Sequence, residues 1–231
     1  MKLPALTPAR TTRLAWLPYV LPFAVFLAFL VIQDRISLRP DIDQPLRLAV
    51  LTAVLWIFSR NVINLRSTQL LGSTLLGVAT FLIWIGPDVL IPGYRESILF
   101  QNSFLGHIRN SIPETAFSSP VILWSRILRA VALVPIIEEL FWRGWLMRWL
   151  IHPRFETVKL GAFRPFSFAV TAILFASEHG PYWDVGLVTG ALWNWWMVRT
   201  KSLGDCILVH AVTNACLCGY VVATHRWEYW L

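Results

Sequence analysis

Long apolar runs separated by short polar connections organise the chain. The runs are Ala15 to Gln33, Leu46 to Phe58, Gln69 to Gly86, Pro120 to Leu150, Phe166 to His179, Val185 to Val198 and Leu203 to Thr224. A helix needs about 20 apolar residues to cross a bilayer, and several of these runs are shorter. No alternation typical of strands stands out. The pattern predicts an all-α, multi-pass transmembrane bundle of six to eight helices.

Composition supports lipid as the solvent. Of the 231 residues, 56% are hydrophobic and only 14% are charged, which is too few charges for the surface of a soluble protein. The 13 tryptophans suit the boundary between hydrocarbon and headgroups. The net charge of +7 does not indicate nucleic acid, because the basic residues lie in short connections between the apolar runs. We therefore expect an integral membrane protein whose partner is the lipid bilayer.

The basic residues also predict an orientation. Lys2, Arg10 and Arg13 precede the first run, which has no small-residue cleavage site after it and so is read as a retained helix. With the N-terminus in the cytoplasm, the positive-inside rule is satisfied by Arg60, Arg66, Arg148, Arg154, Lys159, Arg164, Arg199 and Lys201. We expect a bacterial inner membrane location.

One long polar connection, Pro87 to Ser119, divides the chain. Within it, Phe100, Phe104, Leu105, Ile108 and Ile112 fall at helical spacing, which predicts a helix lying along the outer interface. Residues 1–119 then form N-terminal transmembrane helices with this outer loop, and residues 120–231 form a helical core that holds the chemistry.

Two adjacent carboxylates follow an apolar stretch in the fourth run. Arg143 lies four residues after Glu139, which is the spacing of a helical ion pair. Glu138 is rotated by about 100° from Glu139 on the helix, so it faces elsewhere. One carboxylate is thus structural and the other is free to act, unless the group only caps a helix at the membrane edge.

Two further clusters put histidines on apolar helices. Phe175 and His179 share a face at i and i+4, immediately before Gly180, and His210 and Asn214 do so in the last run. Taken singly, each has a structural alternative: a histidine bonding a free carbonyl, or a hydrogen bond between helices. Together, ionisable groups at membrane depth normally have a partner and a purpose, which predicts a polar intramembrane cavity.

These three clusters, in this order, resemble the CAAX prenyl protease and bacteriocin-processing family of membrane proteins. Its pattern is two glutamates with an arginine four after the second, then Phe-x-x-x-His, then His-x-x-x-Asn or Asp. The sequence has no departure at any of these positions. The resemblance covers about Pro120 to Thr224 and extends, more loosely, to CAAX-protease-related proteins of bacteria that use exosortase.

The resemblance implies a metal-free intramembrane glutamate endopeptidase with no cofactor. Glu138 would be the general base and His179 would hold the water, while His210 and Asn214 would donate to the oxyanion. Glu139, Arg143 and Phe175 would support them. The substrate would be a peptide or protein, including one that is lipid-modified or membrane-anchored, as in the prenylated substrates of eukaryotic members.

Two alternatives stay open. In a zinc peptidase, one glutamate, two histidines and an asparagine would supply the ligands, although His-Glu-x-x-His is absent. In a transporter or scaffold, the same buried groups would conduct protons or bind a partner chain. The cysteines, Cys206, Cys216 and Cys218, match no zinc spacing and are expected to pack as small hydrophobes.

Simple counting of spans leaves one conflict. It places Glu138 and His210 in the cytoplasmic half but His179 near the outer end of its helix, and one site cannot hold all three. Either the helix breaks at Gly180-Pro181 within the membrane, or it begins earlier, near Thr157. We favour the earlier start. Glu178, at the same helix end, is read as solvated and without a role.

Overall fold

The computed structural model describes residues 14–32, 38–102, 106, 108 and 114–230. Within them the protein is all-helical. The helices are α1 (Leu17–Ile32), α2 (Pro40–Val54) with a π-helical end η1 (Leu55–Ser59), α3 (Leu70–Leu90), α4 (Pro120–Leu128), η4 (Arg129–Leu133), α5 (Val134–Glu139), η5 (Leu140–Leu146), α6 (Met147–Trp149), α7 (Pro165–Ser177), α8 (Trp183–Thr200) and α9 (Leu203–Thr224). Since α4 to α6 run on as one rod, the described residues form seven helices, which confirms the predicted range.

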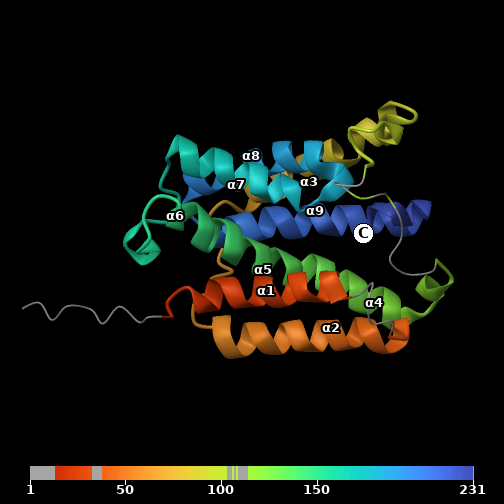
Figure 1. Ribbon diagram of the computed structural model, residues 1–231, viewed down its shortest axis with the longest axis horizontal. Coiled ribbons are helices and arrows are strands. Elements are labelled where there is room, and N and C mark those ends of the chain that lie inside the picture. Colours follow the sequence, from red (N-terminus) through yellow and green to blue (C-terminus); the bar gives the residue numbers. More distant parts are fainter. Residues whose placement is uncertain (1–13, 33–37, 103–105, 107, 109–113, 231) are drawn as a thin grey trace, which may run out of the picture.

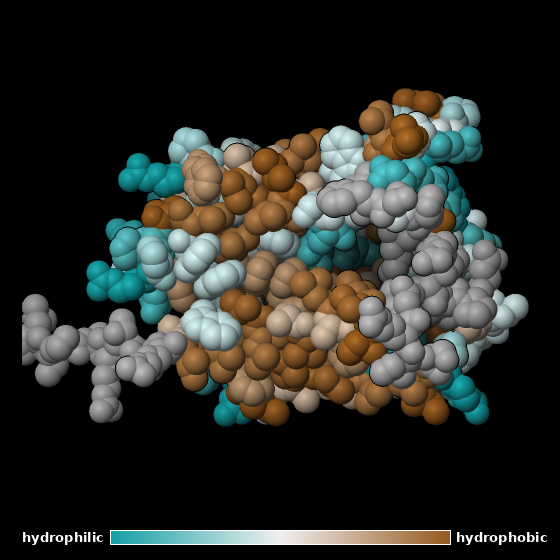
Figure 2. Space-filling view, viewed as in Figure 1, coloured by the Kyte–Doolittle hydropathy of each residue, from teal (hydrophilic) through white to brown (hydrophobic). Residues whose placement is uncertain are grey.

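Four helical stretches are long and apolar enough to cross a membrane. They are Pro40–Ser59, Leu70–Leu90, Pro120–Trp149 and Leu203–Thr224, and two shorter apolar helices, α1 and α7, accompany them. Figure 2 shows that apolar side chains cover most of the visible surface on both sides of a central hollow. Large exposed side chains such as Leu71 and Trp56 would be costly in water but suit lipid.

The helices lie nearly parallel around α9, which occupies the centre of the bundle (Figure 1). Helix α9 packs against α3, α5 and α8, whereas α2 packs against α4, and α1 against η5. The long rod α4–α6 thus separates the pair α1 and α2 from the group α3, α7 and α8.

Two glycines allow α7 and α8 to approach closely. A Cβ added at Gly190 would lie 3.0 Å from Cδ1 of Phe175, and one at Gly186 would lie 3.5 Å from Cβ of His179. This small-xxx-small spacing is typical of helix contacts in membranes. It fixes the end of α7, which carries Phe175, and the following turn, which carries His179, against α8.

Proline explains the irregular middle of the rod. Pro135 has no N–H to donate to a carbonyl one turn back, and its ring would clash with that turn. The preceding residues, Arg129–Leu133, take up a wider π-helical turn, and a second π-helical stretch, Leu140–Leu146, follows α5. Such π segments often occur at functional sites. Here they flank Glu138 and Glu139.

Asp205 ties the start of α9 to the connection before α3. Its Oδ1 accepts from the Ser67 hydroxyl at 2.6 Å, the Gln69 N–H at 2.9 Å and the Ser73 hydroxyl at 2.9 Å. Its Oδ2 accepts from the N–H of Thr68 at 3.0 Å and from its hydroxyl at 2.6 Å. The carboxylate is fully buried and all its partners are donors.

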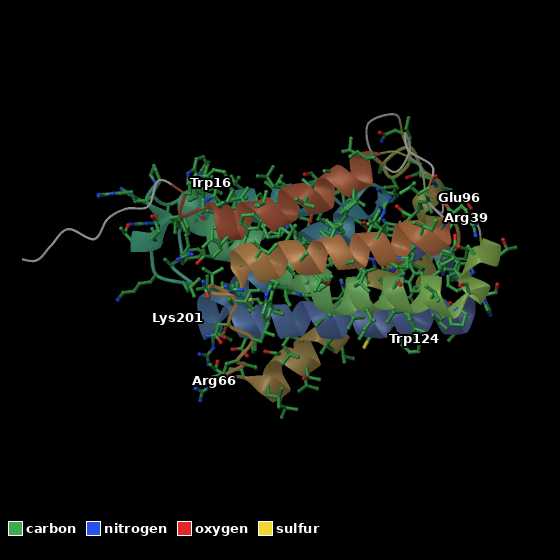
Figure 3. The ribbon with its side chains drawn as sticks, turned by 90° about the horizontal axis from the view of Figure 1, so that it is seen from below. Trp16, Arg39, Arg66, Glu96, Trp124 and Lys201 are labelled. Carbon is green, nitrogen blue, oxygen red and sulfur yellow. The ribbon has the colours of Figure 1, made fainter. Side chains whose placement is uncertain are left out.

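The two ends of the bundle differ in charge. Arg66 and Lys201 lie at one end, and Arg39, Glu96 and Trp124 lie at the other (Figure 3).

The predicted helix along the outer interface, between Phe100 and Ile112, is wrong where the structure describes this connection. Asn102 pairs with Gly106 in an antiparallel bridge, with N–O distances of 3.2 and 2.8 Å, which a helix cannot contain. Phe104, Leu105 and Ile112 lie outside the described residues.

Candidate active site

A cavity of about 390 Å³ opens between the two layers of the bundle. In Figure 2 it appears as a hydrophilic hollow within the apolar surface. Its lining includes all four residues for which the sequence predicts catalysis: Glu138, His179, His210 and Asn214. They come from α5, the turn after α7, and α9, so three distant segments converge on one space.

Glu138 stands near the middle of the rod and faces this cavity. Its side chain is buried, and its Oε2 has no hydrogen-bond partner among the described residues. A carboxylate oxygen of Glu138, one of Glu178 and a ring nitrogen of His179 all lie within 4.8 Å of one another. This separation is within reach of a single bridging water.

Glu178 also belongs to this cluster, although the sequence interpretation gave it no role. Its Oε1 accepts from the indole N–H of Trp142 at 3.2 Å, and one of its carboxylate oxygens lies within 4.8 Å of one of Glu138. Such proximity favours a proton shared between the two carboxyl groups, because two negative charges so close repel each other. Glu178 is exposed, as the sequence interpretation expected, but it also lines the cavity, which that interpretation did not foresee. The available signal was its place beside a candidate histidine at the end of an apolar helix.

The backbone fixes the ring of His179. Its Nδ1 lies 2.7 Å from the carbonyl oxygen of Phe175, and a carbonyl only accepts, so Nδ1 carries the hydrogen. The other nitrogen, Nε2, is then the one that can accept from water. The rings of Phe175 and Trp84 pack on the imidazole, with centroids 4.7 and 5.1 Å away.

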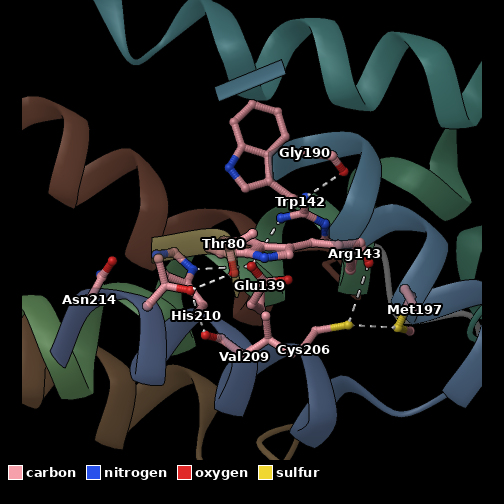
Figure 4. A network of polar contacts seen from close by, with 12 residues as sticks. Thr80, Glu139, Trp142, Arg143, Gly190, Met197, Cys206, Val209, His210 and Asn214 are labelled. Atoms are coloured by element: carbon pink, nitrogen blue, oxygen red, sulfur yellow. Dashed lines mark hydrogen bonds and ion pairs between the residues drawn. The ribbon is translucent and has the colours of Figure 1, made fainter. Parts of the chain in front are cut away.

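The second histidine is held by the other glutamate (Figure 4). Glu139 and Arg143 are fully buried and form the expected ion pair, with Nη1 of Arg143 3.0 Å from Oε1 of Glu139. The same oxygen lies 3.2 Å from Nδ1 of His210. Arg143 also donates to Oδ1 of Asn194 at 2.9 Å. This buried network orients the imidazole of His210 toward the cavity.

Asn214 lies one turn farther along α9 and has a structural contact. Its Nδ2 donates to the carbonyl of Ala130 at 2.8 Å, in the turn that Pro135 deprives of a backbone donor. One of the two amide hydrogens is therefore occupied, and one is left for another acceptor.

Trp193 is a further cavity residue that sequence reasoning missed. Its ring packs on His210 with centroids 4.4 Å apart, and its Nε1 is buried without a hydrogen-bond partner among the described residues. No sequence signal distinguishes it from the other 12 tryptophans of the 13 present.

Counting of spans had placed His179 at a different depth from Glu138 and His210. The structure resolves this conflict, because all three side chains line one cavity. The expected start of α7 near Thr157 is wrong: Phe155–Thr157 forms a separate 3-10 turn, and α7 begins at Pro165. The helix has 13 residues and ends at Ser177. It covers about 20 Å, less than the roughly 30 Å hydrocarbon layer, so its end lies inside the bundle. Gly180 then turns the chain with φ of +50°.

The residues that could bind a metal ion differ from those expected for a zinc peptidase. Glu138, Glu178 and His179 are close enough to hold one metal ion. The ligands expected from sequence were one glutamate, two histidines and an asparagine, and the structure groups a different set. Nδ1 of His210 is instead directed at Glu139.

Comparison with known proteins matches one segment of the chain to a protein family. Residues 120–216 match the family model of Rce1-like proteins, described as type II CAAX prenyl endopeptidases. No curated protein and no solved structure matches significantly. The matched segment contains Glu138, His179, His210 and Asn214, and agrees with the resemblance carried by the three clusters.

Proposed function

We propose that this chain, whose residues 120–216 belong to the Rce1-like family of type II CAAX prenyl endopeptidases, cleaves a peptide bond inside the bilayer with water activated by Glu138. The family makes the protein a CAAX-type membrane protease. The family match therefore favours proteolysis over the function of a transporter or a scaffold. The observation that carries the mechanism is the contact of Glu138, Glu178 and His179 in one cavity.

The first step is attack by water. The Glu138 carboxylate takes one proton of the water, and Nε2 of His179 accepts a hydrogen bond from the other. The water oxygen then bonds to the scissile carbonyl carbon. Because Glu178 shares a proton with Glu138, the pair carries a single negative charge and acts as one base.

The second step stabilises and resolves the tetrahedral intermediate. Nδ1 of His210 faces Glu139, so Nε2 of His210 donates to the oxyanion when the imidazole is protonated, and the Glu139 carboxylate favours that protonated form. The second amide hydrogen of Asn214 donates to the same oxygen. Glu138 then returns its proton to the leaving amine as the peptide bond breaks.

The cavity wall suits a membrane-anchored substrate. Leu27 and Leu30 of α1 line the cavity and are also 36% and 37% exposed on the outer surface. An apolar chain, such as a lipid modification, could therefore pass from the bilayer to the site without crossing water.

The orientation in the membrane is also part of the proposal. The basic end of the bundle, marked by Arg66 and Lys201, faces the cytoplasm, as does the N-terminus, and the membrane is a bacterial inner membrane.

Comparative proteomics tests the proposal. Membrane and secreted fractions of cells with the intact protein are compared with those of cells carrying Glu138→Gln, and Glu156→Gln, at an exposed position, is the matched control. We expect new peptide termini with the intact and control proteins only. Identical termini in all three strains, at equal protein levels, contradict the proposal.

A metal-assisted peptidase is the second candidate, because Glu138, Glu178 and His179 could ligate a metal ion. In that case His179 and both glutamates would bind the ion, which would lower the pKa of its bound water. Elemental analysis of the purified protein separates the two mechanisms. A stoichiometric metal whose removal by chelation abolishes cleavage, and whose return restores it, would replace the metal-free mechanism.

A further inference from the structure

The connection that follows α3 lies against the chain just after His179. A short 3-10 turn, Gly180–Tyr182, follows His179 there and joins α7 to α8. The indole N–H of Trp183, the first residue of α8, donates to the carbonyl of Leu99 at 3.0 Å. The ring of Trp183 also stacks on that of Phe100, with centroids 6.1 Å apart. Two segments far apart in the sequence are therefore joined beside His179.

Arg95 makes the central contacts between these segments. Its side chain is only 4% exposed, and its Nη1 donates to the carbonyl of Pro181 at 2.6 Å and to Oδ1 of Asp184 at 2.8 Å. Its Nε donates to Oδ2 of Asp88, near the end of α3, at 2.9 Å. The guanidinium also lies 4.3 Å from the centroid of the Tyr182 ring. One side chain thus ties α3 to the 3-10 turn and to the first turn of α8.

The charges around Arg95 are complementary. The guanidinium lies between two carboxylates, Asp88 and Asp184. Asp184 also accepts from the hydroxyl of Tyr94 at 3.1 Å, and Asp88 from that of Tyr229 at 3.1 Å. The planar fork of an arginine directs each donor to a fixed place, and removing it would leave both acids without their cation. The group therefore holds the turn in one position.

His179 depends on this turn because no regular helix fixes it. Helix α7 ends at Ser177, two residues before it, and Gly180, immediately after it, has φ of +50°. Only the contact of Nδ1 with the carbonyl of Phe175, at 2.7 Å, ties its ring to α7. A displacement of the turn would therefore move the imidazole.

Helix α3 also reaches the imidazole directly. The ring of Trp84 packs edge-on against that of His179, with centroids 5.1 Å apart. Trp84 lies four residues before Asp88, so both side chains are on one face of α3. Helix α3 thus supports His179 from one side through Trp84 and holds the following turn through Asp88 and Arg95.

We propose that Arg95 is a positioning residue, which keeps Nε2 of His179 at the water beside Glu138 by holding the turn that follows His179. This inference rests on the proposed role of His179 in the hydrolysis. Arg95 is not among the residues that line the catalytic cavity, and it precedes the segment 120–216 that matches the family. It therefore acts through His179 and does not touch the substrate.

Nitrogen NMR of the histidine rings tests the position of His179 without a substrate. The full chain, with nitrogen-15 in the rings of its five histidines, is purified in detergent, and the His179 signal is assigned by its loss in His179→Gln. The contact with Phe175 predicts a single tautomer with its hydrogen on Nδ1. In Arg95→Gln we expect the two ring nitrogens of His179 to shift toward the values of a mixture of tautomers.

Cleavage rates connect this movement to catalysis. The probe is a synthetic peptide that spans a cleavage site found by the comparative proteomics. Arg95→Gln should lower kcat by about 10- to 100-fold, as expected for a displacement of about 1 Å at a reacting group, and should leave KM within about twofold. In a His179→Gln background the same substitution should change kcat by less than about twofold, because its effect passes through His179.

Arg39→Gln is the matched control. Arg39 lies at the same end of the bundle as Glu96 (Figure 3) and forms an exposed ion pair with Asp41 at 2.8 Å, so its loss should change neither the His179 signal nor kcat. If Arg95→Gln does not accumulate as folded protein, Arg95→Lys replaces it. Lysine keeps the charge but lacks the fork, and should give the same changes at a smaller size.

Two outcomes overturn the inference. One is a His179 signal that is unchanged in the Arg95 variants. The other is a loss of kcat as large in the His179→Gln background as in the intact protein, because Arg95 would then serve the fold alone. Cleavage that continues at the full rate in His179→Gln would instead contradict the proposed hydrolysis, whatever the Arg95 variants do to the NMR signal.

Discussion

Two buried carboxylates, Asp205 and Glu138, have opposite surroundings. Asp205 accepts hydrogen bonds from donors on four residues and has no acidic neighbour among them. Glu138 contacts a second acid, Glu178, and keeps one oxygen without a partner among the described residues. A carboxylate saturated with donors is stable and has no free lone pair for a substrate. A buried carboxylate that lacks hydrogen-bond donors lowers the stability of the fold but can accept a proton. Such carboxylates are typical of functional sites.

The largest expected effect is on activity at Glu138. We expect Glu138→Gln to slow cleavage by about 10³-fold, because the amide cannot accept the proton of the water. Its Tm should be unchanged or higher, since a buried carboxylate beside a second acid is removed. Cleavage rates and thermal unfolding of purified protein measure both. A large fall in Tm would mean that Glu138, like Asp205, serves the fold.

The reverse is expected at Asp205. Asp205→Ala leaves the donors of Ser67, Thr68 and Gln69 without their acceptor in a buried position, and should lower the free energy of unfolding by about 3 kcal/mol. Denaturant titration measures this change. The rate per folded molecule should stay within about twofold, because neither Asp205 nor its donors line the cavity. Loss of activity at full stability would contradict the comparison.

Glu139 has an intermediate position, because its Oε1 is bonded by two donors but faces the site through His210. Glu139→Gln should lower kcat by about 10- to 100-fold with little change in KM, as for loss of a transition-state contact. Without the carboxylate the imidazolium of His210 is less stable. The alkaline limb of the pH–rate profile should therefore move to lower pH. An unchanged profile would assign Glu139 to packing alone.

The smallest effect is expected at Glu178. Glu178→Gln keeps a hydrogen bond to Glu138 and should slow cleavage about 10-fold or less, because the base loses the partner that shares its proton. Glu178→Ala, which removes the hydrogen bond as well, should be slower than Glu178→Gln. Rates of both variants under identical conditions decide this. If both match the intact protein, the acid pair is not part of the base.

Local spacing was sufficient to predict much of this molecule. The ion pair of Glu139 and Arg143 follows from their separation of four residues on a helix, and α9 begins and ends where its apolar run does. The start of α7 could also have been predicted, since Pro165 suits the first turn of a helix. The break at Gly180 was considered, and the structure favours it.

What the sequence did not predict depends on contacts between distant segments. Glu178 meets Glu138 across 40 residues of sequence, and neither position has a local pattern that announces the pair. Trp193 lies against His210 for the same reason. The outer connection was predicted as helix from its apolar spacing, but Gly106, with φ of +85°, takes a left-handed conformation and allows Asn102 to pair back. At each of these positions, contacts between distant segments or a local turn determined the structure, and the spacing of apolar residues along the sequence did not.

The continuous rod from Pro120 to Trp149 carries both Arg129 and Glu138, and both side chains line the cavity. When neighbouring helices shift, the cavity can widen or narrow, but the interval between Arg129 and Glu138 is fixed by hydrogen bonds within a single element. A molecule that contacts both side chains would therefore be selected by its length. A one-residue insertion between them would turn the arginine away by about 100° and should abolish that selection without touching the acid.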